Sequence, residues 1–368
     1  MSAKHQKHPK LMKPVFETYA STEIGILGAP CGVIESLCKS IYKGLRSTYN
    51  TIYIDADHGS DNSASDIPVY KDMISHHRID HNKKLNQWEQ KIALRSYDLA
   101  LVNSNHFDAQ CQLIVINNGK ESSLRRKIDR LTDVRGFILD IDVNEPYDWL
   151  YEHIDRSCPI FHIADIDGIT NLIKSQIPIP GIKGLVLAGG KSSRMGVDKS
   201  QIIYHNGMAQ ESHMLQELTT FIDQVFLSKR ELKDDSQHNV IVDFFQKLGP
   251  FGAILSAFRM DPNAAWMVTA CDQPLLSAEH INLLISHRDP SKVATCYFNP
   301  DTDFPEPLIT LWEPKAYPIM LQYLALGNSC PRKVLINSDI CLVKVADTNF
   351  MKNANTPEER EAVLKTLK

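Results

Sequence analysis

Short apolar runs alternate with amphipathic stretches along the first half of the chain. From Ile34 to Leu45, apolar residues recur at i, i+3 and i+4, which predicts a helix with one buried face. Runs with the composition of strands lie at 51–55, 98–103, 112–117 and 136–141, and residues 23–32 combine a strand with a glycine-bearing turn. Strands that alternate with helices predict an α/β fold with a largely parallel sheet. No structure is predicted for the polar stretch 56–97.

The second half repeats this alternation. Strands are predicted at 183–188, 223–228, 239–243, 265–270, 292–298 and 307–312. Helices are predicted at 209–220, 252–260, 277–287, 314–326 and 356–367. The last helix has Thr356 as its N-cap, Pro357 at its first position and two acidic residues in its first turn, all typical of a helix start. The pattern therefore predicts a second α/β domain.

Prolines and glycines interrupt the pattern between residues 174 and 184. These residues break helices and are typical of a linker. We expect a basic, solvated tail at 1–19, a first domain at 20–175, a linker at 176–182 and a second domain at 183–368.

Composition agrees with two folded domains and excludes several classes of protein. The chain has 368 residues, of which 43% are hydrophobic and 23% charged, so a mostly disordered chain is excluded. The net charge of −4 argues against a protein that binds nucleic acid through overall positive charge. No apolar run approaches the roughly 20 residues of a membrane helix, and the basic N-terminus lacks the apolar core of a secretory signal. The eight cysteines form no CxxC pair, so we expect reduced thiols and a cytoplasmic protein that uses neither membrane nor nucleic acid.

The segment LAGGKSSRMGVDKS at 187–200 carries the clearest chemistry. A predicted strand ends at Ala188, and Gly189 and Gly190 then let the backbone approach a ligand closely because they lack a Cβ. Backbone amides in such a turn form a concavity for anions, to which Arg194 and Lys199 add positive charge. Because ligands of open α/β sheets bind at the carboxyl ends of strands, this segment predicts a triphosphate site.

Two aspartates follow other predicted strands. Asp272 comes after the apolar run AWMVTA, where it is placed to hold Mg²⁺ beside phosphates; its alternative role is to cap the helix near residue 277. Asp243 is predicted to lie near the metal or the base of a nucleotide, or else to cap a turn. Gly249 begins a tight loop that forms either a wall of the nucleotide pocket or a simple strand-to-helix turn.

These motifs closely resemble the signature of the molybdenum cofactor guanylyltransferases, the MobA family. The resemblance covers roughly residues 182–368 and includes LGPFGAI (248–254), MVTACDQPLL (267–276) and FMKNANTPEE (350–359) in the family's order. It implies a Rossmann-like nucleotidyltransferase fold and the transfer of GMP from GTP to molybdopterin, with release of pyrophosphate and with Mg²⁺ as cofactor. It also implies partners among proteins that handle the molybdenum cofactor or among molybdoenzymes.

The resemblance assigns roles to individual residues. The catalytic residues it implies are Lys199, Arg194 and Asp272, the last as the metal ligand. The nucleotide-binding residues it implies are Leu187, Ala188, Gly189, Gly190, Lys199, Asp243 and Gly249. Asn353 and Asn355 are implied to contact the pterin substrate or the metal–phosphate centre; ordinary turn asparagines are the alternative.

Two other functions remain open from the sequence. The same chemistry could serve a cytidylyltransferase or another nucleotidyltransferase that acts on a related phosphorylated substrate. A carrier of the cofactor without catalysis is the second alternative, against which Arg194, Lys199 and Asp272 argue.

The first half contains a loop where a phosphate-binding P-loop, GxxxxGK[ST], would follow the first strand. Gly28 matches the first glycine, but Val33, Ile34 and Glu35 stand where glycine, lysine and a hydroxyl residue belong. The lysine and hydroxyl are therefore missing, and an acidic residue at this point would repel phosphate. We expect that this loop does not bind GTP.

The surrounding sequence nevertheless resembles MobB, the small GTP-binding partner of the guanylyltransferase. The strand–turn–helix at 23–46 and the run YDLALVNSNH at 97–106 carry this weaker resemblance, in which Asn103 replaces an acidic residue of the family. The resemblance implies a P-loop-like fold with a degenerate loop, kept for scaffolding, dimerisation or cofactor docking. An unrelated α/β domain is the alternative.

Overall fold

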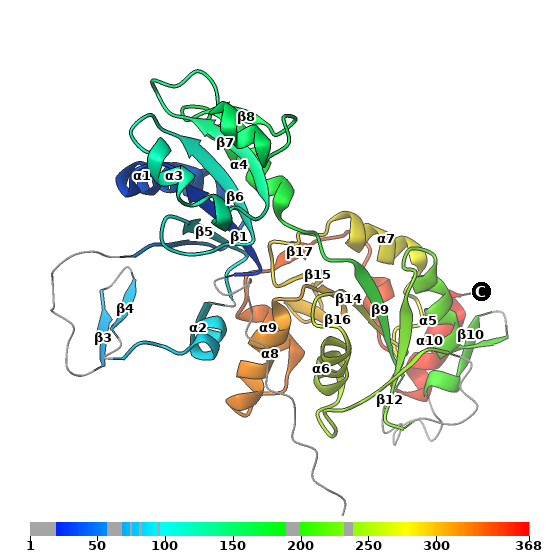
Figure 1. Ribbon diagram of the computed structural model, residues 1–368. Coiled ribbons are helices and arrows are strands. Elements are labelled where there is room, and N and C mark those ends of the chain that lie inside the picture. Colours follow the sequence, from blue (N-terminus) through cyan, green and yellow to red (C-terminus); the bar gives the residue numbers. More distant parts are fainter. Residues whose placement is uncertain are drawn as a thin grey trace, which may run out of the picture. The chain divides into compact units, whose positions relative to one another are not determined.

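The computed structural model describes residues 20–56, 68–73, 76–80, 83–94, 96–188, 199–205, 207–231 and 238–367. The chain divides into two compact units, Met1–Pro178 and Ile179–Lys368. Each unit is built on its own sheet, so each is described separately below (Figure 1). In the described part of the chain, no helix combines the length and apolar character needed to cross a membrane.

Parallel strands form the main sheet of the first unit. In chain order they are β1 (Thr22–Leu27), β2 (Thr51–Ile54), β5 (Leu99–Asn103), β6 (Cys111–Ile116), β7 (Val134–Leu139) and β8 (Ile160–His162). Their order across the sheet is β2-β5-β1-β6-β7-β8, with every neighbouring pair parallel. The chain adds β2 and β5 on one side of β1 and then crosses to β6 on the other. The carboxyl ends of β1, β5 and β6 therefore meet at a switch point, the usual ligand position in such sheets.

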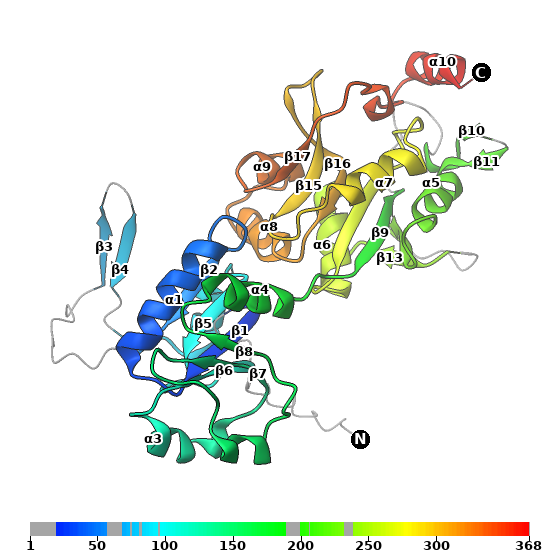
Figure 2. The same cartoon turned by 90° about the horizontal axis from the view of Figure 1, so that it is seen from above.

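Helices cover both faces of this sheet. The helices of the first unit are α1 (Cys31–Leu45), α2 (Gln87–Leu94), α3 (Glu121–Arg125) and α4 (Ile166–Gln176), with the 3₁₀ turns η1 (Ile128–Arg130) and η2 (Asp148–Glu152). The helices α1 and α4 lie side by side (Figure 2) and bury Ile34, Ile41 and Ile169 against one face of the sheet. On the other face, Leu124 of α3 and Leu150 of η2 pack against the sheet. The predicted burial of one face of α1 is confirmed.

The stretch 56–97, for which no structure was predicted, contains a hairpin and a helix. The hairpin consists of β3 (Val69–Asp72) and β4 (His77–Asp80), and α2 follows it. No residue of α2 is buried, and its eight residues are too few for a clear helical period. The elements β8 and α4 also escaped prediction.

The second unit contains a mixed sheet. Its strands are β9 (Ile182–Leu187), β12 (Val225–Lys229), β13 (Val240–Val242), β14 (Ala265–Ala270), β15 (Ala294–Asn299), β16 (Phe304–Trp312) and β17 (Cys341–Val343). Their order is β13-β12-β9-β14-β16-β15-β17, and β16 runs antiparallel to both of its neighbours. A separate small hairpin pairs β10 (Ile203–His205) with β11 (Met208–Ala209). The carboxyl ends of β9, β12, β13 and β14 therefore share one edge of the sheet.

Helices cover both faces of the second sheet as well. The helices of the second unit are α5 (Gln210–Thr219), α6 (Pro250–Met260), α7 (Ala278–Ser286), α8 (Ala316–Ala325), α9 (Pro331–Ile336) and α10 (Pro357–Thr366), with the turns η3 (Lys199–Gln201) and η4 (Asn349–Met351). One core joins α6, α8 and α9 to Trp266 and Trp312, which are both fully buried. A second core, on the opposite face, joins α5 and α7 to Val186 and Met267. This arrangement confirms the α/β class for both halves.

The predicted elements of the second half are all present, with ends displaced by a few residues. The helix predicted at 252–260 begins earlier, because Pro250 takes its first position after Gly249. The predicted start of α10 is confirmed: Thr356 Oγ1 accepts from the Glu359 amide at 3.2 Å, and Glu359 completes the capping box. The short elements α9 and β17 escaped prediction, since three to six residues carry too little periodicity.

Candidate functional site

The strand β9 delivers the glycine-rich segment to the carboxyl edge of the sheet. The strand ends at Leu187, and the structure resumes at Lys199, the first residue of η3. Gly189, Gly190 and Arg194 lie outside the described residues. Of the predicted phosphate site, the structure therefore shows its two ends, Leu187–Ala188 and Lys199.

Lys199 is linked to the C-terminal segment of the chain. Its Nζ donates a hydrogen bond to Oδ1 of Asn355. The Asn355 backbone amide donates in turn to Glu359 Oε2 at 2.6 Å, inside the capping box of α10. The N-terminus of α10 therefore holds Asn355 against the lysine. A sequence separation of 156 residues between the two partners makes this contact a product of the tertiary fold.

Asp272 follows β14 at the same edge of the sheet. Its backbone oxygen accepts from the Ala354 amide at 2.7 Å, so the residue preceding Asn355 is anchored directly to it. Burial raises the pKa of the Asp272 carboxyl, and the nearby Lys199 ammonium opposes that rise. Among the described residues, Oδ1 of Asp272 is buried without a hydrogen-bond partner. The fold thus brings Lys199, Asp272 and Asn355 together, while the cap of α7 is Ser277 and not Asp272.

A second acidic side chain lies behind Asp272 and was missed by the sequence reasoning. Glu306 of β16 is buried, and burial raises its pKa, with a further contribution from the Asp272 charge. The Asn299 amide donates to Glu306 Oε2 at 3.3 Å, and the Gln273 amide to Oε1 at 3.5 Å. A glutamate within the otherwise apolar run FPEPLITLW was the available signal, because an unpaired acid is rarely buried.

A cavity of about 680 Å³ opens at the ends of β9, β12 and β13 beside the start of α6. Its lining includes Leu187, Ser228, Arg230, Asp243 and Gly249. This volume lies within the roughly 300–1,000 Å³ range of small-molecule sites. Leu187, Asp243 and Gly249 had been predicted from the sequence as nucleotide-binding residues, and the fold places them around one space.

The Asp243 carboxylate is held in place inside this cavity. Its Oδ1 accepts from the Ser228 hydroxyl at 2.6 Å, and burial raises its pKa while that hydrogen bond and Arg230 lower it. Gly249 has a backbone φ of +57°, a conformation that residues with a Cβ adopt rarely. Together these features fix the shape of the cavity floor.

Asn353 stands apart from this cluster. Its side chain is exposed and forms no hydrogen bond with any residue in the described ranges. Its predicted role in substrate binding stays a prediction.

The residues around Asp272 fit a hard divalent cation. Mg²⁺ prefers oxygen ligands and is commonly held by one or two carboxylates together with substrate phosphates. The buried, unpartnered Oδ1 of Asp272 supplies such an oxygen at the edge where the glycine-rich segment leaves β9. No group of three or more histidine, cysteine or acidic side chains suited to a metal occurs among the residues that the structure describes. Mg²⁺ held at this oxygen would also be coordinated by substrate phosphates.

At the P-loop position of the first unit, the structure shows a short turn between β1 and α1. Only Gly28, Ala29 and Pro30 separate β1 from α1, so the loop is too short to wrap a triphosphate. Ile34, at the lysine position, is buried in the core. Glu35, at the hydroxyl position, is directed to solvent and pairs with Lys39 at 2.6 Å. The repulsion of phosphate expected from Glu35 therefore does not arise in the space beside Gly28, but the lysine and hydroxyl are indeed absent.

Residues 184–340 match the family described as the MobA-like NTP transferase domain. A molybdenum cofactor biosynthesis bifunctional protein of Synechocystis sp. is 34% identical over 190 residues, which make up 50% of this chain and 54% of that protein. The chain thus spans about half the length of that relative. A probable molybdenum cofactor guanylyltransferase of Carboxydothermus hydrogenoformans is 30% identical over 188 residues, 49% of this chain and 93% of that protein.

Solved structures also show similarity. Molybdopterin-guanine dinucleotide biosynthesis protein A of Archaeoglobus fulgidus aligns with a TM-score of 0.44 and 20% identity, over 50% of this chain and 97% of that one. Bacillus subtilis MobB aligns with a TM-score of 0.31 and 14% identity, over 43% of this chain and 98% of that one. The decisive comparison is the Carboxydothermus sequence, because it is matched over nearly its whole length at 30% identity. Through its second unit, the chain belongs to the MobA-like NTP transferase family.

Proposed function

We propose that this protein transfers GMP from GTP to the terminal phosphate of molybdopterin and releases pyrophosphate. The observation that carries the proposal is the convergence of Lys199, Asn355 and Asp272 at the edge of the sheet. The names of the relatives, molybdenum cofactor guanylyltransferases, support this substrate pair. Phosphoryl-type transfer needs positioning and charge neutralisation more than a covalent nucleophile, and this site offers both.

Charge neutralisation would come from Lys199 and from a cation at Asp272. The Lys199 ammonium is held by Asn355 and would bind phosphate oxygens as a compact point charge. Mg²⁺ bound at the Asp272 carboxylate would supply Lewis-acid polarisation of the α-phosphate. Arg194, from the segment outside the described residues, would assist in binding the pyrophosphate leaving group.

The cavity beside α6 would receive the base. Guanine presents N–H donors on its N1 and N2 positions, and a fixed carboxylate such as that of Asp243 is a suitable acceptor for them. Ser228 donates to Oδ1 of Asp243, so Oδ2 would be the oxygen that accepts from the base. The same carboxylate would not match the N3 acceptor of cytosine, so we expect GTP to be preferred over CTP.

Asn355 and Asn353 would lie nearest the second substrate. Both belong to the segment immediately before α10, in which the Ala354 amide donates to the Asp272 backbone oxygen. Both side chains carry donors and acceptors suited to a pterin or a phosphate. Asn355 would then have two tasks, since it also orients Lys199.

The direct test incubates the full chain with Mg²⁺, molybdopterin and a nucleotide and measures the pyrophosphate released. We expect release with GTP and much slower release with CTP or ATP. Equal rates with GTP and CTP would favour a cytidylyltransferase or a broader nucleotidyltransferase. Binding of molybdopterin with no pyrophosphate from any nucleotide would favour a non-catalytic carrier.

A further inference from the structure

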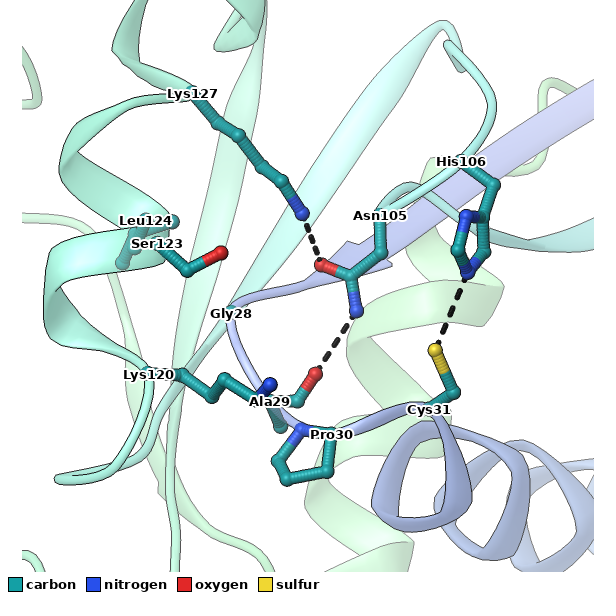
Figure 3. Close-up of a pocket in the computed structure, with 10 residues that line it drawn as sticks. All are labelled: Gly28, Ala29, Pro30, Cys31, Asn105, His106, Lys120, Ser123, Leu124 and Lys127. Carbon is teal, nitrogen blue, oxygen red and sulfur yellow. Dashed lines mark hydrogen bonds between the residues drawn. The ribbon is translucent and has the colours of Figure 1, made fainter.

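The first unit contains a second cavity, at the switch point of its parallel sheet. It occupies about 170 Å³ between the β1–α1 loop, the residues that follow β5, and the segment from Lys120 to Lys127 (Figure 3). This is smaller than the roughly 300–1,000 Å³ of sites for whole small molecules. The space therefore suits a single chemical group, and a nucleoside triphosphate is too large for it.

A thiol and an imidazole meet at one side of this cavity. Cys31 Sγ and His106 Nε2 lie 3.2 Å apart, within hydrogen-bond distance (Figure 3). They come from sequence positions 75 residues apart, so the fold and not a local turn creates the pair. Thiolates are the reactive form of cysteine, and a neighbouring imidazole that accepts the proton activates the sulfur as a nucleophile.

The Asn105 side chain forms hydrogen bonds to the β1–α1 loop on one side of the cavity and to Lys127 on the other. Its amide nitrogen donates to the Ala29 backbone oxygen at 2.9 Å, and its Oδ1 accepts from Lys127 Nζ at 2.7 Å. Figure 3 shows these bonds running from the β1–α1 loop through Asn105 to Lys127. The lysine is therefore held at the cavity rather than extended into solvent.

The lining of the cavity is positively charged. Lys120 and Lys127 line it, and none of its ten lining residues, all within the described ranges, is acidic. Burial lowers the pKa of Lys127, and the neighbouring charges of Arg130, Lys120 and Arg126 lower it further. A bound anion would relieve this repulsion among cations, and the Ser123 hydroxyl would add a hydrogen-bond donor.

We propose that this cavity binds one phosphate-type oxyanion against Lys120 and Lys127 and holds Cys31, paired with His106, as a reactive thiol beside it. The first residue of α1 is Cys31 itself, so the positive end of that helix adds to the field of the lysines. The oxyanion is either inorganic phosphate or the phosphoryl group of a small ester. This site replaces the nucleotide site that the short loop cannot form, and it does not depend on the activity of the second unit.

Alkylation of the full chain with iodoacetamide, followed by mass spectrometry of each cysteine peptide, tests the thiol. In this reaction the S–C bond forms, the C–I bond breaks and iodide leaves, while the thiol proton passes to His106. Cys158 and Cys330 are partly buried as Cys31 is and serve as internal controls, since no histidine contact is recorded for either among the described residues. We expect Cys31 to react about tenfold faster than both controls at neutral pH. The His106→Gln variant should abolish that advantage while leaving Cys158 and Cys330 unchanged.

Protection by anions tests the binding half of the proposal. Millimolar inorganic phosphate should slow alkylation of Cys31 severalfold, against chloride at the same ionic strength, because surface charges alone respond equally to both salts. Lys127→Met should remove the protection, and its unchanged thermal melting would show that the fold persists. A small phosphate monoester in a parallel arm separates the two sources: protection by phosphate alone assigns the free ion, and stronger protection by the ester assigns the phosphoryl group.

Three results would overturn the proposal. The first is alkylation of Cys31 no faster than that of Cys158 and Cys330. The second is no difference between phosphate and chloride. The third is protection by GTP at concentrations far below those needed with phosphate, which would indicate a nucleotide site instead.

Discussion

The side-chain oxygen of Asn355 accepts a hydrogen bond from the ammonium of Lys199, and the amide of the preceding residue, Ala354, donates to the backbone of Asp272. One short segment before α10 therefore touches both the lysine and the aspartate on which the proposed reaction depends.

Replacing Asn355 by alanine should lower kcat/KM for GTP by about 10–100-fold, because Lys199 loses the acceptor that orients it toward phosphate. The matched control is Asn337→Ala, since Asn337 is exposed and its side chain bonds to the Lys333 backbone oxygen. Steady-state pyrophosphate release measures both variants. Equal activity of the two would show that Asn355 is an ordinary turn asparagine.

Asp272→Asn should reduce turnover by about 10²–10³, because it removes a charge that would stabilise the transition state through the metal. The fold should survive, since a neutral amide is easier to bury than a carboxylate whose pKa burial already raises. Pyrophosphate release and thermal melting are compared for the variant and the parent chain. Turnover within about threefold of the parent would remove Asp272 from the mechanism.

The buried ion pair between Arg288 and Glu313 should dominate the response of the second unit to mutation. The guanidinium donates to both carboxylate oxygens, at 2.7 and 2.8 Å, and Glu313 is fully buried. Arg288→Met should therefore cost about 3–5 kcal/mol of unfolding free energy, because it leaves a buried charge unpaired. As a control, removing the exposed partner Glu361 of Lys365 should cost about 0–1 kcal/mol. Urea titration measures both.

The Arg288–Glu313 pair also makes the stability of the folded state depend on pH. Burial raises the pKa of Glu313, and Arg288 lowers it, so loss of Arg288 should raise that pKa further. A carboxyl whose folded pKa exceeds its unfolded pKa stabilises the folded state at low pH and loses that effect as pH rises through the folded pKa. In the Arg288→Met chain, stability should therefore fall as pH rises above about 4.3, the ordinary glutamate value. Adding Glu313→Gln should flatten this slope; a slope that persists would assign it to another group.

Gly28→Ala should destabilise the first unit by about 1–3 kcal/mol, because the backbone φ at Gly28 is +97° and an added Cβ would meet the Val115 backbone oxygen. Gly32→Ala is the matched control four residues later. It lies in α1 with open space around its Cβ position, so alanine there should stabilise by about 0.4–1 kcal/mol. Thermal melting of both variants would reveal whether the tight turn at Gly28 is required.

Titration of the full chain with GTP and Mg²⁺ should show one binding site, since the cavity of about 680 Å³ in the second unit is large enough for a nucleotide and the cavity of about 170 Å³ in the first unit is not. Lys199→Ala should weaken that binding markedly by removing a charge paired with phosphate. Calorimetry gives the stoichiometry directly. Two sites per chain would contradict a single nucleotide site, and binding unaffected by the Lys199 change would remove Lys199 from that site.

The sequence predicted those parts of the fold that depend on local periodicity. Strands with continuous apolar runs, such as β14, and helices with a clear cap, such as α10, are found where they were expected. The position of Asp272 at the carboxyl edge of the sheet was also predicted, because a residue that follows a strand closely must lie at the end of that strand.

What the sequence did not reveal depends on contacts between distant segments. Glu306 appeared as one acid within a strand, and only the antiparallel pairing of β16 with β14 brings it behind Asp272. Cys31 and His106 each looked unremarkable in isolation, since their meeting depends on the parallel register of β1 and β5. The helices α9 and α2, six and eight residues long, are too short for a periodicity argument to detect.

The sequence separation of 156 between Lys199 and Asn355 also sets a delay during synthesis of the chain. At about 5–20 residues per second, a ribosome needs roughly 8–30 s to synthesise that interval. Throughout it, the nascent chain carries Lys199 without the asparagine that accepts its hydrogen bond and without the amide that anchors Asp272. Transferase activity would therefore begin only as the final helix emerges, and a chain terminated before residue 354 would fold its sheet yet remain inactive.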